Sequence, residues 1–148
     1  MNILVIEDNQ FKRDKITDFI KENYDVIVVD ASSYNGGVNK ALEDNFDLIV
    51  LDLSMPTFDR TDTTHGGRFR SLAGKDVATK LERLGRLVPF VVLTGYKDFS
   101  VNSKSLNIGQ IDEILSSMGD CYRGCIIFDA VNSAWEEQLS LIIEGLDK

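Results

Sequence analysis

Short uninterrupted apolar runs, each ended by a polar residue, constrain the fold of this chain more than any other feature. Residues 3–6 (Ile-Leu-Val-Ile) run into Glu7, and residues 48–51 (Leu-Ile-Val-Leu) run into Asp52. Residues 88–94 form a third such run. Apolar runs of this length, separated by helical stretches, are typical of strands buried on both faces of a parallel sheet. The sequence therefore predicts an α/β fold.

Strand and helix patterns alternate five times along the chain, which implies parallel strands joined by right-handed crossovers. We expect a single domain over residues 1–148, with a long inserted polar loop at about 60–73 and an extended segment at 97–123. In that segment we expect two short helices, or one helix after an ordered loop. The predicted strands are 2–6, 25–30, 47–51, 88–94 and 124–128, and the predicted helices are 10–23, about 34–45, 75–85, one within 99–118, and 133–146.

Two of the predicted helices carry apolar stripes that identify their buried faces. In the helix at 133–146, Trp135 begins the stripe and is expected in the core, while Ser133 is the expected N-cap, with Glu136 completing a capping box. The stripe of the helix at 10–23 is predicted to consist of Phe11, Ile16, Phe19 and Ile20.

Composition and charge exclude several classes of protein. The 148 residues carry a formal net charge of −8, which argues against a nucleic-acid-binding surface because such a surface needs a basic stripe. No apolar run is long enough to cross a membrane, and the N-terminus lacks the basic region of a signal peptide, so a cytoplasmic location is expected. Cys121 and Cys125 are the only cysteines and His65 the only histidine, which argues against a closed zinc site and predicts reduced, packed thiols.

The acidic residues at the ends of the first and third strands predict a cation site. The carboxyl ends of strands in a parallel sheet form the ligand crevice, so Glu7, Asp8 and Asp52 are expected to meet there. Three converging carboxylates repel one another, and a hard divalent cation with oxygen ligands relieves that repulsion. Thr94 adds a hydroxyl at the same edge. An acidic pocket, a cation and a hydroxyl together suggest phosphoryl chemistry.

The spacing of these residues resembles the receiver domain of two-component response regulators. The resemblance is carried by the Glu7-Asp8 pair, by Leu-Asp-Leu-Ser-Met-Pro at 51–56 and by Thr94-Gly95, and it covers nearly the whole chain. It implies a flavodoxin-like three-layer sandwich, in which a five-stranded parallel sheet of order 2-1-3-4-5 has helices on both faces.

The resemblance also implies roles for individual residues. Asp52 would accept a phosphoryl group, and Thr94 would donate its hydroxyl to a phosphoryl oxygen. Mg²⁺ would be the cofactor, held by Glu7, Asp8, Asp52 and the backbone carbonyl of Ser54. The phosphodonor would be a histidine kinase or a phosphotransfer protein, and the output a contact with a downstream protein that the sequence does not name. Neither a nucleic acid nor a membrane is expected as a partner, and a homodimer stays open.

One departure from the family pattern concerns the end of the fifth strand. Receivers carry a Lys-Pro pair there, whereas this chain has Phe128-Asp129, so the lysine is absent. Losing a charge-assisted contact of this kind costs ~1.5–3 kcal/mol. The simplest interpretation of the nearby basic residues is that they are solvent-exposed charges of a loop. The alternative is that one of them replaces the missing lysine. The candidates for this replacement are Arg60, Arg68, Arg70 and Lys97.

Three functions compete. The favoured one is a stand-alone receiver whose only enzymatic activity is its own phosphorylation and dephosphorylation at Asp52. The second, favoured by the missing lysine, is a pseudo-receiver that is not phosphorylated and acts as a protein-binding module. The third is a Mg²⁺-dependent phosphohydrolase. Such an enzyme often has an acid two residues after its nucleophile, but Ser54 stands at that position here.

Overall fold

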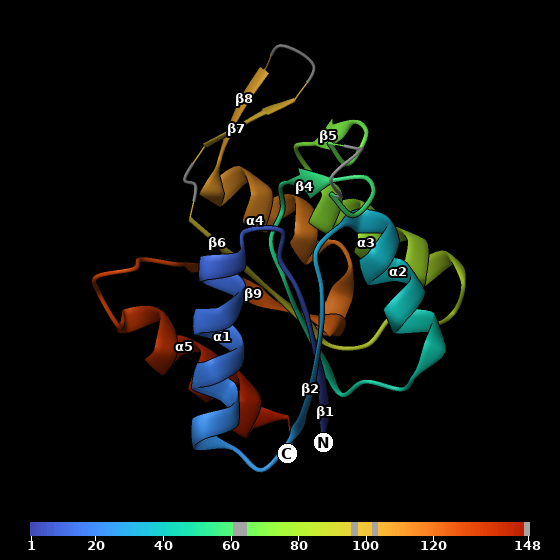
Figure 1. Cartoon of the computed structure of the whole chain (residues 1–148). Coiled ribbons are helices and arrows are strands. Elements are labelled where there is room, and N and C mark those ends of the chain that lie inside the picture. The colour runs from blue at the N-terminus through green and yellow to red at the C-terminus, as the bar shows by residue number, and fades with distance from the viewer. Residues whose placement is uncertain (61–64, 96–97, 102–103, 147–148) are drawn as a thin grey trace.

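A computed structural model of the chain describes residues 1–60, 65–95, 98–101 and 104–146. Within these residues, five parallel strands form one sheet in the order β2-β1-β3-β6-β9 (Figure 1). Numbered along the chain, these five strands have the order 2-1-3-4-5, which confirms the predicted fold class. The strands are β1 (Asn2–Ile6), β2 (Ile27–Ala31), β3 (Leu48–Leu51), β6 (Phe90–Thr94) and β9 (Tyr122–Ile127).

Helices cover both faces of this sheet. They are α1 (Gln10–Asn23), α2 (Tyr34–Glu43), α3 (Ala73–Arg83), α4 (Ile108–Ser116) and α5 (Ala134–Gly145). Figure 1 shows α1 and α5 on one side of the sheet and α2 and α3 on the other. The alternation of side chains along β1 explains both layers: Ile3 and Val5 join the core under α1 and α5, whereas Leu4 and Ile6 join the core that includes α2, α3 and α4.

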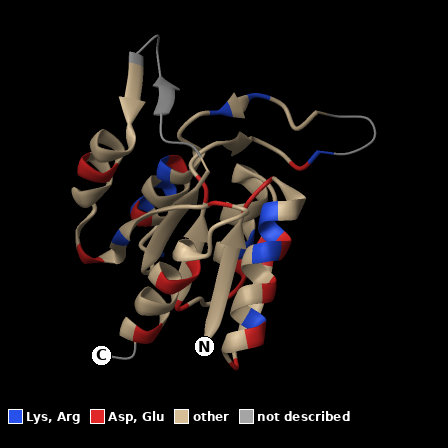
Figure 2. Ribbon diagram, turned by 90° about the vertical axis from the view of Figure 1, so that its left-hand side faces the viewer, with Lys and Arg blue, Asp and Glu red and all other residues tan. Residues whose placement is uncertain are grey.

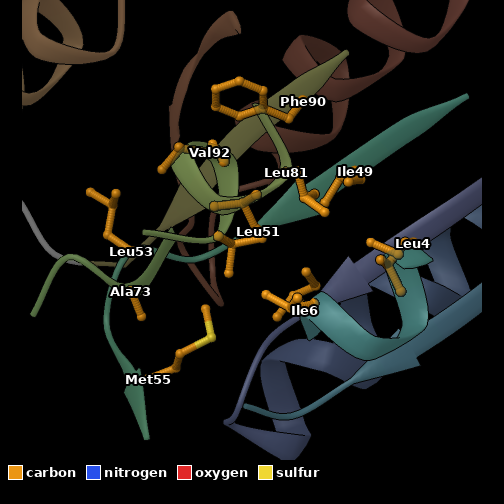
Figure 3. Close-up of a cluster of buried hydrophobic side chains, with 14 of the residues drawn as sticks. Leu4, Ile6, Ile49, Leu51, Leu53, Met55, Ala73, Leu81, Phe90 and Val92 are labelled. Carbon is orange, nitrogen blue, oxygen red and sulfur yellow. The ribbon is translucent and has the colours of Figure 1, made fainter. Parts of the chain in front are cut away.

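The core that includes α2, α3 and α4 extends to the residues around Asp52. Leu51 and Leu53 lie on either side of Asp52 in the sequence, and both are buried against α3, as Figure 3 shows. Gly74 lets α3 approach this closely, because a Cβ at that position would lie 2.5 Å from the backbone oxygen of Asp52. The tight contact fixes the backbone from which Asp52 projects.

In its described residues, the segment at 97–123 has one α-helix after an ordered stretch, which is the second of the two predicted alternatives, but that stretch is a hairpin and not a loop. Its first part is an antiparallel hairpin of β7 (Asp98–Val101) and β8 (Lys104–Asn107), which projects beyond the sheet in Figure 1. The helix α4 begins only after it, and Gly119–Cys121 forms a short 3-10 turn. Polar and apolar residues alternate in β7 (Asp-Phe-Ser-Val), which is the period of a strand, whereas β8 (Lys-Ser-Leu-Asn) carries no such pattern.

Ser133 occupies the N-cap position of α5, as predicted, but the predicted capping box with Glu136 does not form. The side chain of Ser133 makes no capping hydrogen bond, and the N–H of Ala134 is instead accepted by Asn132 Oδ1 at 2.8 Å. A reciprocal capping box does occur at α4, between Asn107 and Gln110. Both helices begin with a residue pair suited to a capping box. The backbone is extended at Asn107 but not at Ser133, which explains why the box forms only at α4.

The buried face of α1 departs from the predicted stripe at one position: Ile16, Phe19 and Ile20 pack against the core as predicted, whereas Phe11 does not. Phe11 was assigned to the apolar stripe but is 57% exposed, whereas Lys12 is only 6% exposed. Lys12 precedes Ile16 by four residues and Ile20 by eight, so all three lie on one face of the helix. The chain therefore directs a charged side chain, not the phenyl ring, toward the strand ends.

A small ribbon lies at the base of the polar loop predicted at about 60–73. Here β4 (Met55–Pro56) pairs antiparallel with β5 (Phe69–Arg70). The ribbon lies at the same end of the molecule as the β7–β8 hairpin (Figure 1). Residues 61–64 of the loop lie outside the described residues.

Three smaller expectations concern individual side chains and the membrane. Trp135 is 4% exposed and packs in the core, as predicted. Cys121 and Cys125 are free thiols, both partly buried. In the described part of the chain, no helix combines the length and the apolar character that spanning a bilayer requires.

Candidate functional site

An acidic cluster forms where β1 and β3 end side by side. The two strands are paired, with Ile6 opposite Leu51, so the residues that follow them emerge together at the carboxyl edge of the sheet. Ligand oxygens of Glu7, Asp8 and Asp52 all lie within 4.8 Å of one another. Figure 2 shows acidic segments at this end of the sheet, near the two projecting ribbons. The structure thus brings together the three carboxylates that the sequence placed at one edge.

Asp52 is buried and its carboxylate is held on both sides. Its side chain is 5% exposed, and its N–H donates to the Ile6 oxygen at 3.1 Å, which ties it to the neighbouring strand. Oδ1 accepts the N–H of Leu53 at 2.6 Å, and Oδ2 accepts a hydrogen bond from Lys12 Nζ at 3.1 Å. These contacts orient the carboxylate before any ligand arrives.

Glu7 is the most deeply buried of the three acids, at 2% exposed. Its Oε2 accepts the N–H of Asn9 at 3.0 Å, and Asn9 in turn caps α1 by accepting the N–H of Lys12. Burial, reinforced by the negative charge of Asp52, raises the pKa of Glu7 to about 8, although the ammonium of Lys12 acts in the opposite direction. Ionisation of the buried Glu7 carboxyl is therefore costly unless a positive charge lies next to it.

Lys12 was not among the site residues predicted from the sequence. Its Nζ lies 2.6 Å from Glu7 Oε1, 3.1 Å from Asp52 Oδ2 and 2.6 Å from the backbone oxygen of Leu93. The helical period of α1 contained the signal, because Lys12 falls on the same face as Ile16 and Ile20. A lysine within the apolar stripe of a helix must lie against the sheet surface on which the helix packs.

The four basic residues considered as replacements for the missing lysine lie in different places. Arg60 Nη1 is 3.3 Å from Asp8 Oδ2, and its side chain is half exposed. The guanidinium of Arg70 pairs with Asp76 at 3.4 Å and stacks 4.1 Å from the ring centre of Tyr34, so it is engaged away from Asp52. The remaining two are Arg68, which is exposed, and Lys97, which lies outside the described residues.

Thr94 and Phe128 occupy the next strand ends along the sheet. Thr94 is fully buried at the end of β6, and its backbone oxygen accepts the N–H of Phe128 at 2.8 Å. Phe128 follows β9, its ring centre lying 5.2 Å from that of Trp135 and 5.7 Å from Lys12 Nζ. Ser54, two residues after Asp52, donates its Oγ–H to the backbone oxygen of Ser71 at 3.0 Å.

A pocket of about 480 Å³ opens onto the acidic cluster. Its lining includes the three carboxylates, Lys12 and Arg60, together with apolar rings from Phe11, Phe69 and Phe128. Oxygen ligands at these separations form the donor set that a hard divalent cation such as Mg²⁺ prefers. The residues present therefore fit a magnesium site, and the pocket leaves room for a small phosphorylated group.

Together, the doubly wound sheet and its carboxylate-lined crevice define a flavodoxin-like α/β protein with an acidic site at the strand ends. Residues 3–117 match the response regulator receiver domain family. The Detocs response regulatory protein DtcB of Enterobacter cloacae (strain JD6301) is 30% identical over 143 residues, which cover 94% of this chain and 95% of that protein. This chain belongs to the response regulator receiver domain family, whose members are signalling modules of two-component systems and act with histidine kinases or phosphotransfer proteins.

Solved structures share the fold at low sequence identity. A DNA-binding response regulator of the LuxR family from Staphylococcus aureus has a TM-score of 0.70 and 16% identity, covering 99% of this chain and 98% of that one. The response regulator TrrA from Thermotoga maritima, in complex with Mg²⁺-BeF, has a TM-score of 0.66 and 18% identity. The match covers 98% of this chain and 97% of TrrA. At these identities the likeness establishes the arrangement of the chain, and the site must be argued from its own residues.

Proposed function

We propose that this receiver domain accepts a phosphoryl group on Asp52 in a Mg²⁺-dependent reaction and signals through contacts with other proteins. The observation that carries the proposal is the convergence of the Glu7, Asp8 and Asp52 carboxylates within 4.8 Å of one another beside an open pocket. Three acids gathered in this way are costly for the fold unless they serve to bind positive charge. Mg²⁺ is the cation that their hard oxygen atoms suit.

Asp52 is the acceptor in this proposal because it is the acid at the centre of the site with a fixed orientation. Its carboxylate oxygen forms a bond to phosphorus while the bond between phosphorus and the donor's leaving group breaks, and the electron pair departs with the leaving group. The Leu53 N–H, 2.6 Å from Oδ1, holds the carboxylate in place during this transfer. The hydroxyl of Thr94, at the neighbouring strand end, donates to a phosphoryl oxygen of the product.

Glu7, Asp8, Asp52 and the backbone carbonyl of Ser54 would hold the Mg²⁺. When bound, the ion supplies positive charge that lets a carboxylate approach a negatively charged phosphoryl donor. Asp8 suits this role as the most accessible of the acids, with a side chain that is 16% exposed, while Glu7 and Asp52 are almost fully buried.

The test of the acceptor compares two aspartate variants. Wild-type protein incubated with Mg²⁺ and acetyl phosphate is expected to gain the mass of one phosphoryl group, and Asp52→Asn is expected to gain none because the amide is not a nucleophile. Asp18→Asn, which changes an exposed aspartate on α1, is the matched control and is expected to react like the wild type. Intact-protein mass spectrometry reads out all three.

Other outcomes of this experiment point to the competing functions. A wild-type protein that stays unmodified with acetyl phosphate and also with a histidine-kinase donor would support a protein-binding module that is not phosphorylated. The presence of Phe128 where receivers carry a lysine is the observation that favours this second candidate. Continuous release of phosphate from many substrates would support a phosphohydrolase instead.

Arg60 provides a separate prediction about the cation. Its contact with Asp8 at 3.3 Å competes with Mg²⁺ for a proposed ligand, but the side chain is half exposed, and surface ion pairs contribute ~0.2–1 kcal/mol. We therefore expect Arg60→Gln to tighten Mg²⁺ binding by at most about fivefold. Titration calorimetry measures the affinity, with Arg83→Gln, an exposed arginine of α3, as the control. Weaker binding in Arg60→Gln would show that the guanidinium supports the site.

A further inference from the structure

Lys12 is a buried cation in direct contact with the proposed phosphoacceptor. Its side chain is 8% exposed, and lysine is almost never buried to this extent unless it is paired. The ammonium has three donor hydrogens, and three oxygen atoms surround it: Glu7 Oε1, Asp52 Oδ2 and the backbone oxygen of Leu93. These three partners come from the ends of β1, β3 and β6.

The place of the missing strand-5 lysine is taken by a ring that packs against this ammonium. Phe128 follows β9, packs at a tilted angle against Trp135 of α5, and presents its ring to Lys12 Nζ at 5.7 Å. An aromatic ring at this distance attracts a cation and shields it from water. The apolar residue at position 128 is therefore part of the environment that holds the lysine of α1.

We propose that Lys12 supplies, from helix α1, the positive charge that stabilises the phosphoryl group on Asp52. This inference rests on the proposed function and adds a residue to it. The ammonium is 3.1 Å from Asp52 Oδ2, so a phosphoryl group joined to that carboxylate lies next to it. Lys12 keeps its proton throughout and donates hydrogen bonds, while the only bonds that change are those to phosphorus.

Among the described residues, the basic side chains of the long loop are less well placed for this role. Arg60 contacts Asp8 from a half-exposed position, and Arg70 is engaged by Asp76 and Tyr34. The ammonium of Lys12 is also anchored at 2.6 Å to Leu93, the residue before Thr94, so it stays near the acceptor when other contacts rearrange. A charge held in a water-poor site is worth more to a developing negative charge than one in solvent.

The experiment exchanges the charge between positions 12 and 128. Lys12→Met keeps the length of the side chain and removes the charge, Lys12→Gln keeps a hydrogen-bond donor for Leu93, and the double variant Lys12→Met/Phe128→Lys returns a lysine from β9. Lys15→Met, an exposed lysine of the same helix, is the control. For each protein, circular dichroism checks the fold, calorimetry gives the Mg²⁺ affinity, and the rate of modification by acetyl phosphate and the affinity for beryllofluoride give the function.

A contact to a charged group contributes ~1.5–3 kcal/mol, which corresponds to roughly 10- to 150-fold. We expect both single substitutions at position 12 to slow modification and weaken beryllofluoride binding by factors in that range. Mg²⁺ affinity is expected to be retained or increased, because the ammonium no longer competes for Glu7 and Asp52. The double variant is expected to be modified at least tenfold faster than Lys12→Met. The control Lys15→Met is expected to react at the wild-type rate.

Three results would overturn the inference. If folded Lys12→Met and Lys12→Gln are modified at the wild-type rate, Lys12 has only a structural role, and the proposed function still stands. If Mg²⁺ affinity falls in parallel with the rate and Phe128→Lys restores neither, the lysine only holds the acids together. If the wild type itself is not modified by any donor, the proposed function fails and takes this inference with it.

Discussion

Replacing Gly74 with valine is expected to lower the free energy of unfolding by about 3 kcal/mol, the upper part of the usual range for overpacking. A Cβ at this position of α3 would lie 2.4 Å from Leu51 Cδ1 and 2.5 Å from the backbone oxygen of Asp52. The second of these is a backbone atom directly after the central strand β3, so it cannot move aside as a flexible side chain would. Urea denaturation followed by circular dichroism measures the loss.

The same substitution is expected to affect the acceptor. To relieve the contact, α3 and the end of β3 must separate, and Asp52 would then leave the positions set by Leu53 and Lys12. Even where the variant is fully folded, we expect slower modification by acetyl phosphate, because a displacement of about 1 Å costs about 100-fold in rate.

Gly109→Val is the matched control for both measurements. Gly109 lies in the first turn of α4, and its nearest neighbour, Asn107 Oδ1, would be at an ordinary distance of 3.4 Å from a Cβ. The control is expected to leave stability within about 1 kcal/mol of the wild type, the scale of helix propensities. A Gly74→Val protein as stable and as reactive as this control would show that the contact between α3 and β3 is not tight in solution.

Replacing Glu7 with glutamine is expected to remove a pH dependence of stability from the metal-free protein. Burial raises the pKa of Glu7 from 4.5 to about 8 in the folded state. Between these values the folded protein binds more protons at this site than the unfolded chain does, so the wild type loses stability as the pH rises from about 4.5 through about 8. The slope from one such group is at most ~1.4 kcal/mol per pH unit.

The measurement is the difference between the two unfolding free energies as a function of pH, with a chelator present throughout. We expect the free energy of unfolding of Glu7→Gln to rise steadily relative to that of the wild type between pH 5 and pH 8, because glutamine cannot ionise. Groups elsewhere in the chain titrate in both proteins and cancel in the difference. Glu22→Gln, at an exposed position of α1, is expected to give a flat difference over the same range. Parallel curves for Glu7→Gln and the wild type would mean that Glu7 is ionised when folded, through its pair with Lys12.

Most of the fold could be predicted from the sequence because its central strands leave a clear pattern of burial. The strands β1, β3 and β6 are short apolar runs, and the predicted ranges for β1 and α1 agree with the observed Asn2–Ile6 and Gln10–Asn23. The β7–β8 hairpin was missed because a short two-stranded ribbon that stands apart from the main sheet lacks a long apolar run. Its residues were instead interpreted as part of a helix or an ordered loop.

The candidate site was predictable only where it follows from strand order. Glu7, Asp8 and Asp52 come directly after strands that are neighbours in the sheet, so the topology is sufficient to bring them together. Arg70 illustrates the opposite case: its distance from Asp52 in the sequence is short, but Asp76 and Tyr34 hold its guanidinium elsewhere. Proximity in the sequence to an acceptor does not determine where a long side chain points.

The α/β fold and the carboxylates at its edge could be inferred from the amino-acid sequence, because burial on both sheet faces leaves a distinct apolar pattern and the ends of neighbouring strands must meet. The cation that faces Asp52 could be identified only from the folded chain. Helix α1 exposes Phe11 and buries Lys12, and this choice depends on how the helix packs against β1 and β2 and on the contacts of Lys12 with Leu93 and the ring of Phe128. A charge buried by packing between distant segments has no local signature, so it becomes visible only when those segments are in place.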